Sequence, residues 1–388
     1  MFSSRTRWDR ARNRLATLTQ ERRRSGLPII DLTVSNPSAV GLGAPADVLA
    51  LLGDGAGAEY APDPRGLAAA REAVAQDFAR RGHQVAADGI VLSASTSEAY
   101  AWLFKLLCDP GDVVLVPRPS YPLFDFLADL ECVETRCYPL VYEGAWHVDL
   151  AALEEAVTQQ TRAVVLVNPN NPTGSYLSRT EADRIQGLCA RRGLALVSDE
   201  VFADFDFRPD PARVTSLAAD GPALTFALGG LSKSCGLPQL KLAWIALSGP
   251  PDLRDEALAR LEIVADTYLS VGTPVQRAAP EILRRLPALQ APIAARVRRN
   301  HAALQHAVGK RSPLTPLAAA GGWSAVLQVP ATLPEEERVC GLLESEGVLV
   351  HPGFFFDFAS EAYLVVSLLA EPAVFDAGLA RVLAAAAH

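Results

Sequence analysis

The feature that most constrains the fold is a series of short apolar segments separated by helical ones, beginning near residue 65. The apolar segments are continuous runs, without the alternation of apolar and polar residues typical of a half-exposed strand. Strands of this kind are buried on both faces, as in a parallel sheet covered by helices. The expected strands are residues 89–93, 113–116, 163–167 and 194–198, and the expected helices are residues 66–81, 96–108, 150–158 and 178–192. We therefore predict an α/β fold whose functional residues lie at the carboxyl ends of the strands.

Both ends of the chain differ from this middle region. Residues 5–24 carry arginine and leucine at helical spacing, and a short strand is expected over residues 29–33. The C-terminal part predicts helices over residues 275–309, 335–346 and 373–386 and strands over residues 323–328 and 363–367. We expect these segments to form a smaller α+β unit beside the larger one.

The composition narrows the class of function. The chain has 388 residues, 49% of them hydrophobic, and a formal net charge of −8. A chain of this length can form a large core, and it lacks the excess of basic residues typical of a nucleic-acid-binding protein. We expect no membrane span, no secretory signal and no metal site, because there is no long apolar run and no H-E-x-x-H motif. The six cysteines are scattered without a C-x-x-C pair, which favours reduced thiols in a cytoplasmic protein.

Polar residues follow several of the predicted strands. Ser95, Thr96 and Ser97 come after the strand over residues 89–93, and Ser95 and Glu98 have the spacing of a capping box that starts a helix. Free N–H groups and hydroxyls at such a helix start suit a phosphate group, but most capping boxes bind no ligand. The strand over residues 163–167 is followed by Asn-Pro-Asn-Asn-Pro-Thr-Gly, a rigid turn or an ordinary loop.

Two charged residues are candidates for catalysis. Asp199 follows the strand over residues 194–198, where a buried carboxylate needs a cationic partner. Lys233 lies among small residues. It is either a lysine that forms a Schiff base or an ordinary surface lysine.

In their order and spacing, these motifs resemble those of the class I/II aminotransferases, the aspartate-aminotransferase-like enzymes of fold type I that use pyridoxal 5'-phosphate. The strongest matches are the loop over residues 168–174, the Asp199–Glu200 pair, and Ser-Lys at residues 232–233 followed by Gly-Leu-Pro. The resemblance runs from about residue 28 to the end of the chain. It implies a large cofactor-binding domain of residues 46–279, with a mostly parallel sheet flanked by helices. The implied smaller α+β domain comprises residues 1–45 and 280–388.

The resemblance assigns a role to each matching residue. It implies that Lys233 holds the cofactor as a Schiff base and moves a proton on the substrate, and that Asp199 keeps the pyridine nitrogen protonated. It places Asn171 on the ring oxygen and Tyr121 on the ring face. The other implied cofactor positions are Ser95, Thr96 and Ser97 at the phosphate, Phe202 beside the ring, Lys241 at the phosphate, and Tyr60 reaching the phosphate of a neighbouring subunit.

The substrates and the assembly follow from the same resemblance. It implies a small amino donor, such as an amino acid, and a 2-oxo acid acceptor. Ser35 and Asn36 match a segment that lies over the substrate. The role of Tyr60 requires a homodimer with shared active sites.

Three departures from the family concern the cofactor. Phe202 replaces a tyrosine that hydrogen-bonds the ring oxygen, Gly230 replaces a serine that contacts the phosphate, and Lys241 replaces an arginine that clamps it. Lysine keeps the charge of arginine but loses its bidentate geometry.

The fourth departure concerns the substrate. Val365 falls where the family carries an arginine that binds the substrate α-carboxylate. Either another cation serves, with Arg118 and Lys105 as weak candidates, or the substrate presents no free carboxylate there. The nearby His351–Asp357 segment, rich in phenylalanine, lines an apolar pocket or belongs to the core of the small domain.

Two alternative functions remain open from the sequence. One is another reaction of the same fold, a C–S lyase, decarboxylase or synthase, since the cofactor supplies the chemistry. The other is a non-catalytic cofactor-binding protein. The presence of Lys233, Asp199 and Asn171 together argues against the second.

Overall fold

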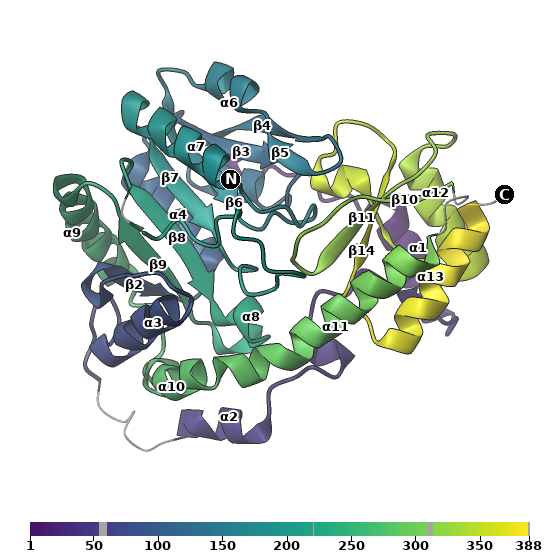
Figure 1. Ribbon diagram of the computed structural model, residues 1–388, viewed down its shortest axis with the longest axis horizontal. Coiled ribbons are helices and arrows are strands. Elements are labelled where there is room, and N and C mark those ends of the chain that lie inside the picture. The colour runs from purple at the N-terminus through teal and green to yellow at the C-terminus, as the bar shows by residue number, and fades with distance from the viewer. Residues whose placement is uncertain (54–59, 220, 309–312, 387–388) are drawn as a thin grey trace.

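The large unit is built on an eight-stranded sheet (Figure 1). The computed structural model describes residues 1–53, 60–219, 221–308 and 313–386. In order across the sheet, the strands are β2 (Ile90–Ser93), β9 (Ala243–Ser248), β8 (Thr225–Gly230), β7 (Ala195–Asp199), β6 (Thr161–Val167), β3 (Val113–Arg118), β4 (Glu134–Tyr142) and β5 (Trp146–Val148). The central strands β8, β7, β6, β3 and β4 are parallel, whereas β9 is antiparallel to β2 and β8, and β5 is antiparallel to β4.

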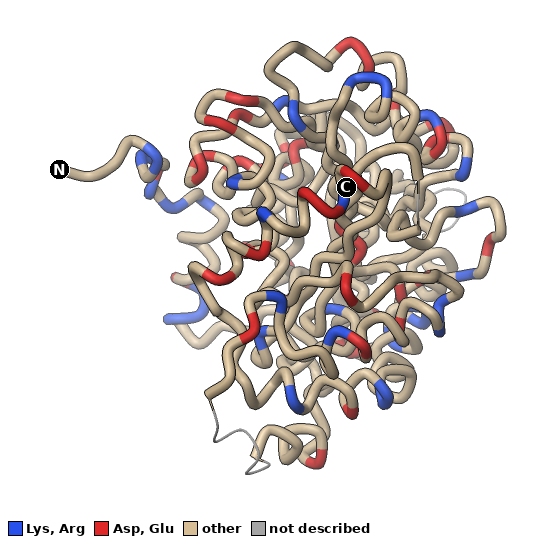
Figure 2. Tube along the Cα trace, turned by 90° about the vertical axis from the view of Figure 1, so that its left-hand side faces the viewer, with Lys and Arg blue, Asp and Glu red and all other residues tan. Residues whose placement is uncertain are grey.

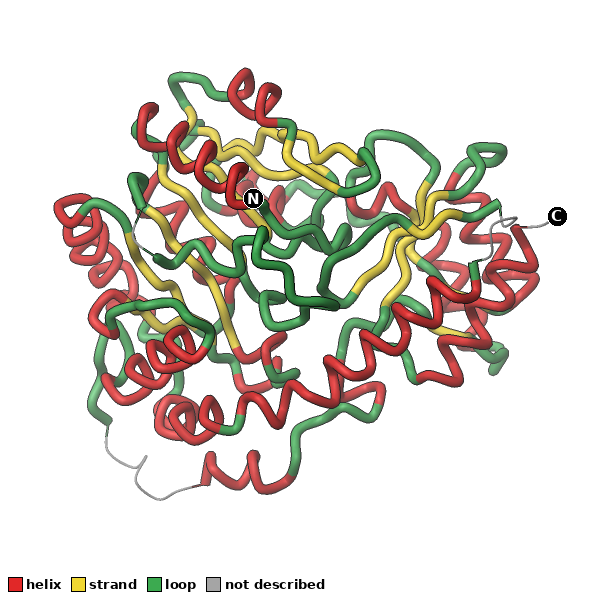
Figure 3. The backbone as a smooth tube through the Cα atoms, viewed as in Figure 1, coloured by secondary structure: helices red, strands yellow, loops and turns green. Residues whose placement is uncertain are grey.

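Helices cover both faces of this sheet (Figure 3). Along β6, Val165 packs into the cluster formed with α4, α5 and α9, and Val164 and Leu166 pack on the opposite face with α6 and α7. The remaining part of that second face is covered by α3 and α10. The bounds are α3 (Ala68–Arg80), α4 (Thr96–Leu107), α5 (Phe124–Leu130), α6 (Leu150–Ala156), α7 (Arg179–Arg192), α9 (Pro251–Tyr268) and α10 (Thr273–Arg284). The continuous apolar strands are therefore buried on both faces, which confirms the predicted α/β class.

The smaller unit lies at the right of Figure 1 and contains a four-stranded antiparallel sheet. Its strands, in order, are β10 (Thr315–Pro316), β11 (Ser324–Gln328), β14 (Tyr363–Ser367) and β13 (His351–Pro352). A separate parallel pair joins β1 (Ile30–Asp31) to β12 (Val348–Leu349), so the N-terminal segment packs with the C-terminal part. The accompanying helices are α1 (Arg14–Arg24), α11 (Leu286–Ala307), α12 (Glu335–Gly341) and α13 (Pro372–Ala386), whereas Val48 of α2 (Ala46–Ala50) packs with α3 and α10 of the large unit.

Two predicted helices were too long. The helix expected over residues 5–24 starts at Arg14, because the side chain of Asn13 accepts from the Ala16 N–H and caps it. The helix expected over residues 275–309 is two helices, α10 and α11, joined at Arg285. Pro287 lies in the first turn of α11, where proline is tolerated because its missing N–H would have no helical partner.

Several strands were missed, and for two of them there is a physical reason. β4 has many exposed residues, so it lacks the apolar run of a central strand. β8 ends in Gly229 and Gly230, which weaken the strand pattern.

The division of the chain at residues 45/46 and 279/280 remains our proposal. Ile282 and Leu283 of α10 pack with Phe78 of α3 in one core cluster.

Figure 2 shows acidic and basic residues mixed along the trace. In the part of the chain that the structure describes, no helix is both long and apolar enough to cross a membrane.

Candidate active site

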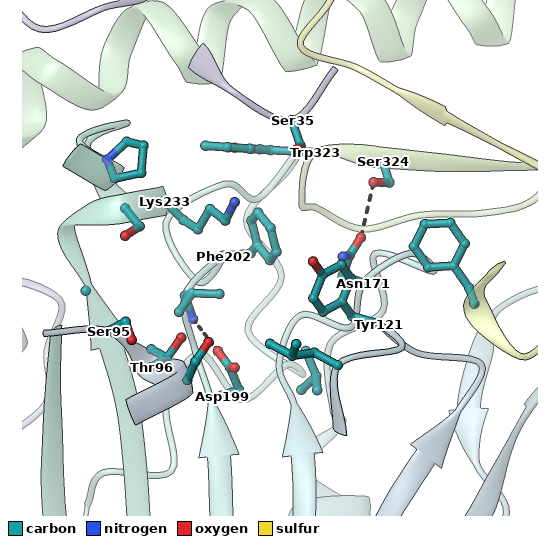
Figure 4. Close-up of a pocket in the computed structure, with 18 of the residues that line it drawn as sticks. Ser35, Ser95, Thr96, Tyr121, Asn171, Asp199, Phe202, Lys233, Trp323 and Ser324 are labelled. Atoms are coloured by element: carbon teal, nitrogen blue, oxygen red, sulfur yellow. Dashed lines mark hydrogen bonds between the residues drawn. The ribbon is translucent and has the colours of Figure 1, made fainter. Parts of the chain in front are cut away.

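A cavity of about 380 Å³ lies at the carboxyl ends of β6, β7 and β8, facing the small sheet. Figure 4 shows the side chains of Lys233, Asp199 and Asn171 pointing into it. The three residues come from separate strand ends, as predicted for a parallel sheet. The polar residues that line the cavity are Thr33, Ser35, Ser95, Thr96, Ser97, Tyr100, Tyr121, Asn171, Asp199, Ser232, Lys233, Ser324, His351 and Ser367.

Asp199 forms the floor of the cavity at the end of β7. Its carboxylate accepts from the Tyr100 hydroxyl at 3.1 Å and from the Val201 N–H at 3.2 Å. Burial raises the pKa of this carboxyl to about 6, against the lowering effect of both hydrogen bonds and of the Lys233 ammonium. A cationic ligand group beside Asp199 would therefore be held strongly.

Lys233 lies on α8 (Leu231–Ser234), a single turn that follows β8 directly. Its Nζ is 5.3 Å from the centroid of the Trp323 ring and 5.8 Å from that of Phe202. Burial lowers the pKa of the Lys233 amine, and the Asp199 carboxylate only partly opposes this. A lysine in such surroundings gives up its proton more readily and becomes a better nucleophile.

The N-terminus of α4 forms one end of the cavity. Ser95 is the N-cap, and its Oγ accepts from the Glu98 N–H at 3.1 Å. The Glu98 carboxylate accepts from the Ala94 N–H at 2.7 Å, one residue before the N-cap, so only the Ser95 half of the predicted capping box is formed. The hydroxyl-bearing residues Thr96 and Ser97 line the same end, where the helix dipole favours an anion.

The loop after β6 holds Asn171 in place. Ser324 Oγ donates to Asn171 Oδ1 at 3.1 Å, so the amide nitrogen remains as a donor on the cavity side (Figure 4). Gly174 closes the loop at a φ of +67°, and a Cβ there would collide with the Gly321 carbonyl oxygen. Tyr121, half-exposed, lies in front of Asn171 in the same view.

Three of the four positions that depart from the resemblance also lie at the cavity. Phe202 packs edge-on against Trp323, with ring centroids 5.4 Å apart. A Cβ on Gly230 would lie 3.0 Å from the Ala243 Cβ, so a serine there would be tightly packed. Val365 lines the cavity from the centre of β14. Among the described lining residues, only Lys233 and His351 have side chains that can carry a positive charge.

Several predicted site residues lie elsewhere in the described chain. Tyr60 is 76% exposed and lines a different, small pocket. Lys241 is exposed at a φ of +52° and is not among the lining residues. Asn36 caps its own turn through the Ser38 N–H, although its neighbour Ser35 lines the cavity.

The candidate substitutes for the arginine are paired outside the cavity. Lys105 forms an ion pair with Glu131, and Arg118 lies 3.6 Å from Asp357 with about half of its side chain exposed. Neither residue lines the cavity.

Tyr100 and Ser324 were missed by the sequence reasoning. Tyr100 is four residues after Thr96 and three after Ser97, so helical spacing already placed it on their face of α4. Ser324 comes from the small sheet, and no local signal links it to Asn171. Among the described residues, no group of three or more histidine, cysteine or carboxylate side chains is arranged to hold a metal ion.

Comparison with known proteins identifies a family. The model for aminotransferase class I and II matches residues 28–373. Glutamate-pyruvate aminotransferase AlaA of Escherichia coli (strain K12) is 29% identical over 256 residues, 65% of this chain and 63% of that protein. S-alkyl-thiohydroximate lyase SUR1 of Arabidopsis thaliana is 31% identical over 243 residues, 61% of this chain and 52% of that protein. These matches therefore span only about half to two thirds of the relatives' lengths.

A solved structure shares the whole fold. Alanine aminotransferase from Pyrococcus furiosus superposes with a TM-score of 0.88 at 21% identity, covering 98% of each chain. At this identity the likeness concerns the fold, and it confirms the fold type I architecture that the motifs implied.

Proposed function

Because the chain belongs to the class I and II aminotransferases, a family of pyridoxal-phosphate enzymes, we propose that it transfers an amino group between a small amino compound, such as an amino acid, and a 2-oxo acid. The observation that carries this proposal is the placement of Lys233, Asp199 and Asn171 around one cavity. A binding protein with no need for a reactive amine has no physical reason to bury Lys233 beside Asp199.

The lining residues fit the cofactor in chemistry. The helix start at Ser95, Thr96 and Ser97 suits its phosphate, the Lys233 amine suits its aldehyde, and the Asp199 carboxylate suits its ring nitrogen. Asn171 offers an amide donor for the ring oxygen, and Tyr121 offers a ring face. When bound, pyridoxal phosphate would supply an electron-accepting ring that stabilises negative charge developing on the substrate carbon.

Asp199 acts on the electronics of this ring. A buried carboxylate whose pKa is raised to about 6 favours a cationic partner strongly, because the pair relieves the cost of burying its charge. A protonated ring nitrogen is such a partner. Tyr100 and Val201 keep the Asp199 oxygens oriented through their hydrogen bonds.

Lys233 acts on the aldehyde and on the substrate carbon. Burial lowers the pKa of its amine, which raises the fraction of neutral nucleophile near neutral pH. The Nζ of Lys233 would also be the base that moves a proton at the substrate carbon. Phe202, without a hydroxyl, leaves this region less polar than the family's tyrosine does.

Carboxylate recognition is atypical in this proposal. Val365 supplies no charge, and Arg118 and Lys105 lie outside the cavity. On this side, among the described lining residues, His351 is the one side chain near Val365 that can carry a positive charge.

We further propose a cytoplasmic homodimer. The exposed ring of Tyr60 is free, within this chain, to reach a neighbouring subunit's phosphate site. The six cysteines are free thiols, which favours a reducing compartment. The partners are thus the amino donor and the 2-oxo acid, with no nucleic acid and no membrane.

The test is a titration of the cofactor-loaded enzyme with a panel of amino acids and matched amines. We expect a free amino acid to bleach the yellow absorbance and a 2-oxo acid to restore it. Release of ammonia and a thiol, with the yellow colour kept or regained without any added 2-oxo acid, would favour the lyase alternative, to which the similarity to the Arabidopsis lyase also points. A yellow form that responds to no compound would contradict the proposal.

A further inference from the structure

The register of the small sheet places a histidine beside Val365, the position at which the family carries an arginine. Residues paired across an antiparallel ladder share one face of the sheet. His351 of β13 is paired with Val365 of β14, and both line the cavity. The imidazole of His351 is thus the ionisable group nearest to Val365 along the cavity face of this sheet.

The three hydroxyl side chains on this wall already donate their protons elsewhere, whereas the buried Trp323 Nε1 of the cavity lining has no partner. Ser324 Oγ donates to Asn171 Oδ1 at 3.1 Å, and Ser367 Oγ donates to the Val34 carbonyl at 2.5 Å. Thr33 Oγ1 donates to Asp31 Oδ1 at 2.6 Å. A carboxylate, which can only accept, finds no available donor in these three hydroxyls.

The surroundings of His351 act on its pKa in opposite directions, and the net result is a lowered pKa. Burial lowers its pKa, whereas the Asp31 carboxylate and a hydrogen bond to the Thr33 backbone raise it. Asp31 comes from β1 and lies 3.8 Å from Arg23 of α1. The neighbouring rings of Phe355 and Phe356, with centroids 5.8 Å and 5.7 Å away, and the side chain of Val365 are uncharged.

We propose that His351 binds the carboxylate of the amino acid and of the 2-oxo acid, in the protonated form, in place of the missing arginine. This inference rests on the proposed aminotransferase function. It requires a proton on the imidazole, with one N–H held by the Thr33 backbone and the other donated to the substrate. Asp31 stabilises that charge from behind, as a carboxylate behind a histidine commonly does.

The proposal predicts a pH dependence that an arginine would not give. Above the pKa of His351, the protonated fraction falls tenfold per pH unit, so the dissociation constant of a carboxylate ligand rises by the same factor. Burial places this pKa below 6.5. Carboxylate binding should therefore weaken steadily between pH 6.5 and pH 8, while a neutral isostere should bind equally at both.

The experiment measures binding of propanoate and of propanamide to the cofactor-loaded enzyme by calorimetry. These probes lack an amine, so they do not react at the cofactor. We expect His351→Gln to weaken propanoate at least tenfold at pH 6.5 and to leave propanamide within twofold. His147→Gln, on the surface with 37% of its side chain exposed, is the matched control and should change neither.

A second variant keeps the inference open to refutation if His351→Gln folds poorly. With His351 retained, Val365→Arg should bind propanoate tightly and should remove the pH dependence of that binding. Propanoate affinity in the wild type that is flat from pH 6.5 to pH 8, or equal losses for both probes, would overturn the role of His351. Failure of the aminotransferase proposal itself would appear separately, as a yellow form that no amino acid bleaches in the wild type.

Discussion

Replacing Asp199 by asparagine tests whether the charge of this carboxylate, which we assign to cofactor binding, lowers the stability of the cofactor-free protein. Burial raises the folded-state pKa of Asp199 from 3.8 to about 6. A raised pKa means that the folded protein binds the proton more tightly than the unfolded chain. The ionised carboxylate therefore does not lower the free energy of unfolding below pH 3.8. It lowers this free energy progressively as pH rises toward 6, and by the full amount above pH 6.

The size of this loss of stability follows from the two pKa values of Asp199, 3.8 and about 6. Each pH unit of difference corresponds to about 1.4 kcal/mol, so the full cost is about 3 kcal/mol at most. The side chain is only partly buried at the cavity floor, and asparagine adds an N–H group that has no acceptor there. We therefore expect Asp199→Asn to stabilise the cofactor-free protein by about 1–3 kcal/mol at pH 7.5, and by about 1 kcal/mol or less at pH 4.5.

The assay is thermal unfolding of the cofactor-free protein at the two pH values. Unfolding entropy scales with length, and for a chain of this size about 1 kcal/mol shifts the melting temperature by about 1 °C. Asp183→Asn, an exposed carboxylate on α7, is the control and should shift the melting temperature at neither pH. A cofactor-free Asp199→Asn protein that melts below the wild type at pH 7.5 would refute the reasoning.

Three further predictions follow from the site. Lys233→Ala should abolish turnover and the yellow colour, because no other amine lines the cavity among the described residues; a yellow, active variant would contradict the assignment of Lys233. Phe202→Tyr should restore a hydroxyl beside the ring oxygen and lower the pKa of the Lys233–cofactor nitrogen, which the pH dependence of the visible absorbance measures; an unchanged titration would show that the tyrosine does not reach the ring. Gly174→Ala should destabilise the protein by about 2 kcal/mol or more in urea unfolding, since a φ of +67° and the Gly321 carbonyl both exclude a Cβ; equal stability would mean that the loop moves freely.

The sequence predicted the parts of the fold that local patterns encode. The buried strands β2, β3, β6 and β7 are continuous apolar runs, and each was expected from that pattern alone. The break between α10 and α11 was not expected, although Pro287 carries a local signal for it, because a proline is disfavoured inside a helix and tolerated in the first turn.

The site was predictable where its residues follow a strand directly. Asp199 and Asn171 meet in one cavity because parallel strands end at the same edge. Ser324 and His351 were not assigned roles because the register of the small sheet, formed between distant segments, brings them there. A single sequence carries no local signal for such pairings, since loop closure and packing decide them.

The central claim is that the enzyme moves an amino group, and transfer of a nitrogen label tests it most directly. The cofactor-loaded enzyme is incubated with nitrogen-15 alanine and unlabelled 2-oxoglutarate, and the products are analysed by mass spectrometry beside Lys233→Ala. If these two serve as substrates, we predict labelled glutamate and pyruvate in equal amounts with the wild type and neither with the variant; other amino acids and 2-oxo acids are tested in the same way. Label recovered only as free ammonia, with no labelled amino acid from any donor and acceptor pair, would contradict the account.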